Sequence, residues 1–245
     1  DEGARILTRH RVLRLLREGN AVTGAVVRNE QEVEVRAEIV VNASGPWTGR
    51  VAALAGCSLP LLLRKGVVVA TEGPPVGSVV SRCRSPADGD IIVPVGRVGP
   101  VGRVSLLGTT DVPAADPDAL EVTREEVGRL LEEGEAMVPG IRKAKVLMAW
   151  AGVRSLACED EGAPDDGRRV TRSHALLDHR ERDGVEGFLT ITGGKLTIFR
   201  LMAQETVDAI CSHLGSTRPC RTHEEALPDP GEAGGPWLGP DRSLH

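Results

Sequence analysis

Two glycines and a lysine stand where an apolar strand is expected to give way to a helix. The strand is predicted over Phe188–Thr192, and Gly193, Gly194 and Lys195 follow it directly. Glycine tolerates positive φ and lets a flat ring approach the backbone closely. A cation at the start of a helix stabilises an anion. The run therefore indicates a site for a planar or anionic ligand, the alternative being a plain glycine turn beside a surface lysine.

A second strand–helix turn follows the continuously apolar run Ile39-Val40-Val41. That run is typical of a buried parallel strand, and it is followed by small residues, among them Ala43, Ser44 and Gly45, before Trp47. Small residues let a backbone pass close to a ligand, and a helix N-terminus offers unpaired amides to a phosphate. A tight turn with no ligand is the alternative.

Arg154 and Arg172 are the arginines whose surroundings point to an anion site. A guanidinium suits phosphate or carboxylate because its planar fork donates two parallel hydrogen bonds. The alternative for Arg154 is an ion pair with Glu159 or Asp160 nearby in the sequence. We expect no metal site at Cys211, His213, Cys220 and His223, since Cys211 and His213 diverge by roughly 200° around a predicted helix.

These runs resemble segments of the FAD-dependent oxidoreductases related to D-amino acid oxidase and glycerol-3-phosphate dehydrogenase. Residues 40–47 are similar to the family's V-N-A-A-G-x-W segment, and residues 193–200 to its G-G-K-L-T-T-Y-R run, with Phe199 in place of Tyr. Residues 152–156 resemble G-V-R-P-L, with Ser155 in place of Pro. The run Gly108-Thr109-Thr110-Asp111 resembles the family's G-T-T, and a strand-end turn without a ligand is its alternative interpretation.

The resemblance implies FAD as the cofactor and assigns roles to particular residues. The implied cofactor-binding residues are Ala43, Ser44, Gly45, Trp47, Gly193, Gly194, Lys195, Leu196 and Thr197. The implied substrate-binding residues are Arg154, Arg172, Lys195 and Thr110. Lys195 and Arg154 are also the catalytic candidates.

Residues 81–91, 177–184 and 214–220 are similar more specifically to catalytic subunits of anaerobic glycerol-3-phosphate dehydrogenases. This resemblance implies oxidation of sn-glycerol 3-phosphate to dihydroxyacetone phosphate, with a hydride passing from C2 to the flavin and electrons passing to a quinone through partner subunits. The chain would then be peripheral to the inner face of the cell membrane, without direct membrane insertion.

Two other functions stay open. An amino-acid oxidase of the same superfamily would use the arginines and the lysine for a carboxylate. A non-catalytic fragment or partner-binding module would hold no cofactor, and it is favoured by the absence of a G-x-G-x-x-G run from the sequence. We expect the chain to be the middle portion of a larger subunit.

The expected fold is α/β: a partial Rossmann-like FAD-binding domain interrupted by a mixed-sheet substrate domain. Residues 1–62 and 150–227 are assigned to the FAD-binding domain, and residues 63–149 to the substrate domain. Residues 228–245 are rich in Pro and Gly and are predicted to be a linker. Within the substrate domain, Thr123 and Glu126 form a capping-box pattern that predicts a helix start.

Composition excludes several other classes of function. Thirty Lys and Arg against thirty-five Asp and Glu leave a net charge of -5, which argues against a nucleic-acid partner. Aromatic residues are only 2% of the chain, too few for a stacking platform. Five dispersed cysteines are typical of reduced cytoplasmic thiols. No apolar run approaches the roughly 20 residues of a membrane-spanning helix.

Overall fold

The computed structural model describes residues 3–73, 76–97, 103–158 and 173–225. The chain forms two compact units, residues 1–196 and residues 197–245. The predicted fold class is confirmed: the first unit combines helices with mixed sheets that hold parallel and antiparallel strand pairs. The domain boundaries after residues 62 and 149 stay predictions.

The N-terminal strands form a three-stranded antiparallel sheet, in the order β1 (Arg11–Glu18), β2 (Ala21–Arg28) and β3 (Glu32–Arg36). Alternate residues of β2 are buried, as expected of a strand with one face on a core. Val22 packs there with Leu15, on the same core as Ala52 and Phe188 from later elements. Through this shared core, the sheet packs against the elements that carry the predicted cofactor residues.

A second three-stranded sheet has the order β11 (His174–Asp178), β12 (Phe188–Gly193) and β4 (Val40–Asn42). β12 pairs in parallel with β4 and antiparallel with β11. A short 3-10 turn, η1 (Gly45–Trp47), leads from β4 into helix α1 (Thr48–Leu54), and α3 (His179–Asp183) follows β11. Because β4 and β12 are parallel neighbours, the segments after them leave the same edge of the sheet.

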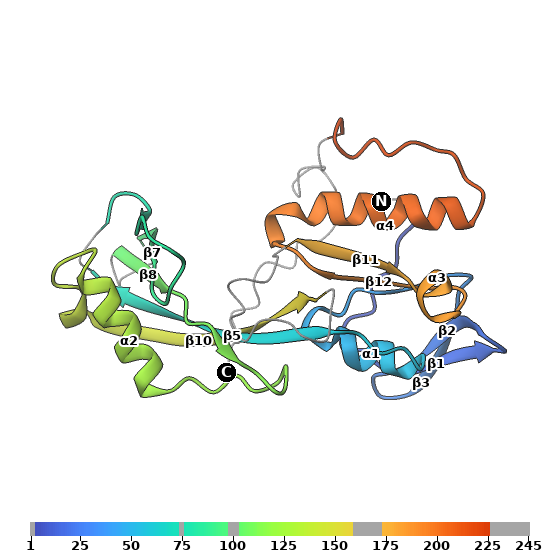
Figure 1. Ribbon diagram of the computed structural model, residues 1–245, viewed down its shortest axis with the longest axis horizontal. Coiled ribbons are helices and arrows are strands. Elements are labelled where there is room, and N and C mark those ends of the chain that lie inside the picture. Colours follow the sequence, from blue (N-terminus) through green and yellow to red (C-terminus); the bar gives the residue numbers. More distant parts are fainter. Residues whose placement is uncertain (1–2, 74–75, 98–102, 159–172, 226–245) are drawn as a thin grey trace. The chain divides into compact units, whose positions relative to one another are not determined.

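The largest sheet has six strands, which are β5 (Leu61–Glu72), β6 (Val80–Ser81), β7 (Ile91–Arg97), β8 (Arg103–Gly108), β9 (Val112–Pro113) and β10 (Lys145–Ala157). Their order is β10-β5-β8-β7-β6, with β9 also on β5, and the described neighbours are antiparallel. Figure 1 shows the long strands β5 and β10 side by side. They run from the predicted substrate domain into the region beside β12.

Helix α2 (Arg124–Glu135) covers one face of this sheet, where Leu130 joins Val67, Val69 and Leu107 in a buried core. The predicted capping box is confirmed. The Thr123 hydroxyl accepts from the Glu126 amide at 3.1 Å, and the Glu126 carboxylate accepts from the Thr123 amide at 3.0 Å. Helix α2 therefore does not cover the opposite face of β5 and β10, where side chains of the candidate site lie.

The second unit contains helix α4 (Phe199–His213), which matches the helix expected after Lys195, and η4 (Leu196–Ile198) precedes it. The helix ends at His213 with Leu214 as its C-cap, and Gly215 follows with φ +69°, the conformation that favours glycine at a helix C-terminus. Among the described residues, no helix has the length and hydropathy needed to cross a membrane.

Candidate cofactor and substrate site

The segments after β4 and β12 meet strand β10 at a pocket of about 520 Å³. Its lining residues are Pro46, Val153, Arg154, Ser155, Leu156, Gly193, Gly194, Lys195 and Leu196. The structure thus brings the predicted Gly-Gly-Lys run and the predicted Arg154 to one place, although about 40 residues of sequence separate them. The pocket has the size of a small-molecule site.

Gly193 and Gly194 both have positive φ, +73° and +75°. At Gly193 a Cβ atom would lie 2.8 Å from the carbonyl oxygen of Ser173, so a side chain does not fit. Lys195 and Leu196 are exposed at the pocket, and Thr197 begins the second unit. The glycines therefore leave backbone, rather than side chains, to face a ligand beside the lysine.

The turn after β4 is held from inside by Asn42, which is 2% exposed. Its amide donates to the carbonyl oxygen of Thr48 at 3.0 Å, and its oxygen accepts from the Ser44 hydroxyl at 2.5 Å. Gly45 has φ +56°, and a Cβ there would meet no atom within 4 Å. Space beside this turn is therefore open to a ligand.

Of the turn residues, Pro46 lines the pocket, whereas Ala43, Ser44, Gly45 and Trp47 flank it in the chain. The Trp47 indole N–H donates instead to Asp118 at 3.0 Å. The pattern of small residues correctly predicted the position of the turn. Nothing in the sequence indicated that Pro46, among the turn residues, would line the pocket.

Arg154 contacts strand β5 and the segment between β8 and β9. Its Nη2 donates to Thr109 Oγ1 at 2.6 Å, and its Nη1 lies 3.6 Å from a carboxylate oxygen of Asp111. A Cβ on Gly66 would lie 2.8 Å from the central guanidinium carbon, so glycine is needed for the guanidinium to rest against β5. With 31% of its side chain exposed, Arg154 remains open to the pocket.

Asp111 is itself held by Arg64, which lies opposite Arg154 in the β5–β10 register. Arg64 Nε donates to the Asp111 carboxylate at 3.0 Å, and Nη2 donates to the Asp111 carbonyl oxygen at 2.9 Å. Sequence reasoning pointed to the run that contains Thr109 and Asp111 but chose Thr110 from it, and it missed Arg64 and Gly66 as supports of the site. A glycine inside the apolar run of β5 is a signal for close packing that could have found Gly66.

The other predicted residues have different placements. Thr110 is fully buried: its hydroxyl accepts from the Val67 amide at 3.0 Å and lies 3.4 Å from Glu126 Oε1, so the structure does not bring it to the pocket. Arg172 lies outside the described residues, and so do Glu159 and Asp160, the partners considered for Arg154.

A group that the sequence did not predict is formed by Cys57, His179 and Asp183, whose ligand-type atoms lie within 4.8 Å of one another. His179 Nδ1 is 2.5 Å from Asp183, and Nε2 is 2.8 Å from Thr190 Oγ1. Burial raises the pKa of the Cys57 thiol, and Asp183 raises it further. With both imidazole nitrogens engaged, the group acts as a hydrogen-bond network that ties α3 to β12.

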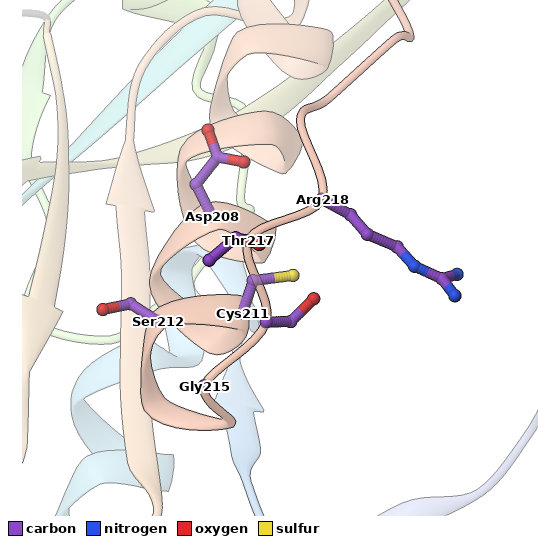
Figure 2. A pocket seen from close by; sticks show the side chains of 7 residues that line it. Asp208, Cys211, Ser212, Gly215, Thr217 and Arg218 are labelled. Carbon is purple, nitrogen blue, oxygen red and sulfur yellow. The ribbon is translucent and has the colours of Figure 1, made fainter.

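The second unit has a separate pocket of about 380 Å³ at the end of α4 (Figure 2). Asp208 and Cys211 line it from the helix, and Thr217 and Arg218 from the segment that follows. In Figure 2 the Arg218 side chain extends away from the helix. None of the residues predicted to bind cofactor or substrate lines this pocket.

The pocket at Arg154 fits the flavin part of FAD in the chemistry of its lining. A flat ring can approach the backbone at Gly193 and Gly194, and open space lies beside Gly45. Lys195 and Arg154 supply positive charge at the same pocket. Bare glycine backbone beside two positive charges suits a planar, electron-accepting group next to an anionic substrate.

A sequence model of the family described as FAD dependent oxidoreductase (DAO) matches residues 1–208, and the chain belongs to this family. The resemblance seen in the sequence is thus confirmed, with FAD as the cofactor of the family.

Three proteins of known sequence or structure are similar to this chain. Over 233 residues the chain is 43% identical to a subunit of the anaerobic glycerol-3-phosphate dehydrogenase of Escherichia coli (strain K12), covering 93% of the chain and 42% of the relative. The corresponding protein of Haloferax volcanii is 35% identical, with 93% and 40% covered. The glycerol-3-phosphate dehydrogenase of Bacillus halodurans, solved with FAD, aligns with a TM-score of 0.68 at 27% identity, covering 87% of this chain and 40% of that one. The chain spans about two fifths of these relatives.

Proposed function

We propose that this chain forms part of an FAD-dependent dehydrogenase that oxidises sn-glycerol 3-phosphate to dihydroxyacetone phosphate. The observation that carries the proposal is that Arg154 and Lys195 line one pocket beside Gly193 and Gly194. A dianionic phosphate is bound by cations held in place. A flavin ring beside it needs a stretch of backbone without side chains that it can approach closely. The names of the similar proteins support the same substrate.

Each residue at the pocket has a distinct task in this proposal. The Arg154 fork binds two phosphate oxygens and orients the substrate, because its guanidinium is already held by Thr109 and Asp111. Lys195 contributes an exposed cation that stabilises negative charge developing beside it. FAD, when bound, supplies the acceptor for the hydride that leaves C2 of the substrate. Gly45, Pro46, Gly193 and Gly194 would hold it.

The remaining substrate and partner assignments rest on resemblance. Arg172 would add a second guanidinium to the phosphate site. Thr110 would support the site from within the core, through its bond to the Val67 amide. Partner subunits are proposed because the similar proteins are named as subunits of anaerobic dehydrogenases. By family resemblance alone, electrons would pass through those subunits to a quinone. We place the protein on the cytoplasmic side, peripheral to the membrane through those subunits.

The test is a substrate comparison with the FAD-loaded protein. Reduction of a soluble dye acceptor is measured with glycerol 3-phosphate, glycerol, glycine and sarcosine at matched concentrations. We expect turnover with glycerol 3-phosphate, and much weaker turnover with glycerol because the cations lack their phosphate partner. Preferential oxidation of glycine or sarcosine would instead identify an amino-acid oxidase. A protein that takes up no flavin, judged from its visible absorption, would be the non-catalytic module.

A further inference from the structure

We propose that Asp111 is a positioning residue, which together with Gly66 aims the Arg154 guanidinium into the pocket. The proposal rests on the function proposed above, in which Arg154 binds the substrate phosphate. Asp111 does not line the pocket itself, so a positioning effect on the substrate would pass through Arg154, which does.

The Asp111 carboxylate is a fixed support. It is 5% exposed, and Arg64 holds the same residue by its carboxylate and by its main-chain oxygen. Strand β9, which begins one residue later, pairs with β5 next to Arg64, so the backbone at Asp111 is anchored as well. A side chain held in this way can orient a neighbour without losing further freedom.

The Arg154 guanidinium is constrained from three directions. Thr109 Oγ1 accepts from Nη2 at 2.6 Å, Asp111 lies 3.6 Å from Nη1, and the bare backbone of Gly66 supports the flat face. An arginine that is already oriented loses less conformational entropy when it binds an anion. The Arg154 side chain is 31% exposed and lines the pocket.

Two roles for Asp111 predict opposite results when its charge is removed. If the carboxylate acted only as a counter-charge that weakens the local positive potential, Asp111→Asn would bind an anion more tightly. If it positions Arg154, the same change lets the guanidinium swing and weakens anion binding. A purely structural role would lower thermal stability while leaving anion affinity unchanged.

The experiment measures binding of inorganic phosphate by calorimetry, and KM and kcat for glycerol 3-phosphate with the FAD-loaded protein, in the whole polypeptide that contains this chain. The variants are Asp111→Asn and Gly66→Ala. The second changes no charge and overlaps only the flexible end of Arg154, so the fold is kept. Asp88→Asn is the control, since Asp88 pairs with Arg129 at 2.8 Å and lines no part of the pocket.

We expect both variants to weaken phosphate binding and to raise KM by about tenfold with little change in kcat, because a ground-state contact is lost. The control should match the parent. Phosphate affinity that is unchanged or tighter in Asp111→Asn overturns the proposal, and if that variant does not fold, unchanged affinity in Gly66→Ala overturns it equally. Arg154→Ala distinguishes failure of the proposed phosphate site from failure of the positioning role of Asp111. If it retains phosphate affinity, the phosphate site itself is wrong, whereas if it loses affinity while Asp111→Asn does not, only the positioning role fails.

Discussion

Asn42 and Thr190 are partners in the parallel pairing of β4 and β12, and the Asn42 amide donates to Thr190 Oγ1 at 3.3 Å. On its other side Thr190 is 2.8 Å from His179 Nε2. In the neutral imidazole, the proton on Nδ1 would face the Asp183 carboxylate, so that Nε2 would accept from the threonine hydroxyl. This buried chain of hydrogen bonds fixes the turn after β4 relative to the strand that leads to the two glycines.

We predict that Asn42→Ala lowers the free energy of unfolding by roughly 1–3 kcal/mol, because buried partners of the amide are left unsatisfied. Urea denaturation measures the loss. Asn20→Ala is the matched control: Asn20 is exposed and donates to the Gly184 carbonyl oxygen at 3.3 Å, so its loss should stay within about 0.5 kcal/mol. Equal stability of the two variants would show that the Asn42 network contributes nothing.

Arg154→Lys should damage the enzyme nearly as much as Arg154→Ala, because an ammonium keeps the charge and loses the fork that contacts Thr109 and Asp111. We expect kcat/KM for glycerol 3-phosphate to fall more than about tenfold in both variants. Kinetics with glycerol as a second substrate provide the check, since the preference for the phosphorylated compound should disappear. A lysine variant that behaves like the parent would contradict phosphate binding through the fork.

Lys195→Ala should reduce turnover by more than about tenfold if Lys195 stabilises developing charge. Its side chain is exposed, so stability should change by less than about 0.5 kcal/mol. Steady-state kinetics and a thermal melt test both parts. Lys143→Ala, an exposed lysine elsewhere in the unit, is the control. Activity within about twofold of the parent would remove Lys195 from the reaction.

Glu126 gives a prediction about pH. Burial raises its pKa, but hydrogen bonds from the Thr123 amide and the Lys65 ammonium outweigh burial and leave the pKa below the ordinary value of 4.5. A depressed carboxyl pKa in the folded state stabilises the protein above the ordinary value, and this stabilisation is lost as the pH falls through the folded-state pKa.

Glu126→Gln should therefore be less stable than the parent by roughly 1–3 kcal/mol at pH 7, and the difference should shrink below about pH 4.5. Denaturation curves at pH 7 and in acid measure it. Glu125→Gln, an exposed change in the same helical turn, is the control and should show little difference. A gap that stays constant with pH would mean that the charge of Glu126 does not contribute.

Cys57 should resist alkylation. Burial and the nearby Asp183 raise the pKa of its thiol, and the residue is 3% exposed. At pH 8 we expect iodoacetamide to modify the exposed Cys83 more than about tenfold faster, as mass spectrometry of timed samples would record. Similar rates at the two cysteines would show that the group around His179 opens readily.

The sequence by itself determined the local elements and the family. The apolar run before the two glycines located β12 and the helix that follows it, and the spacing of Thr123 and Glu126 predicted the start of α2, because caps and apolar patterns depend on residues close in the sequence. The runs around Gly193 and Arg154 carried the resemblance to flavin-dependent oxidoreductases, which the comparisons confirmed.

Only the tertiary structure decided the partners of those residues. The acids considered for Arg154 lay a few positions along the chain, whereas the described contacts are with Thr109 and Asp111, brought there by the pairing of β10, β5 and β9. The segment between β8 and β9 also separated two adjacent threonines: Thr109 contacts the arginine, and Thr110 is bonded inside the core. No motif distinguishes these neighbours, so only the path of the backbone selects which hydroxyl meets the site.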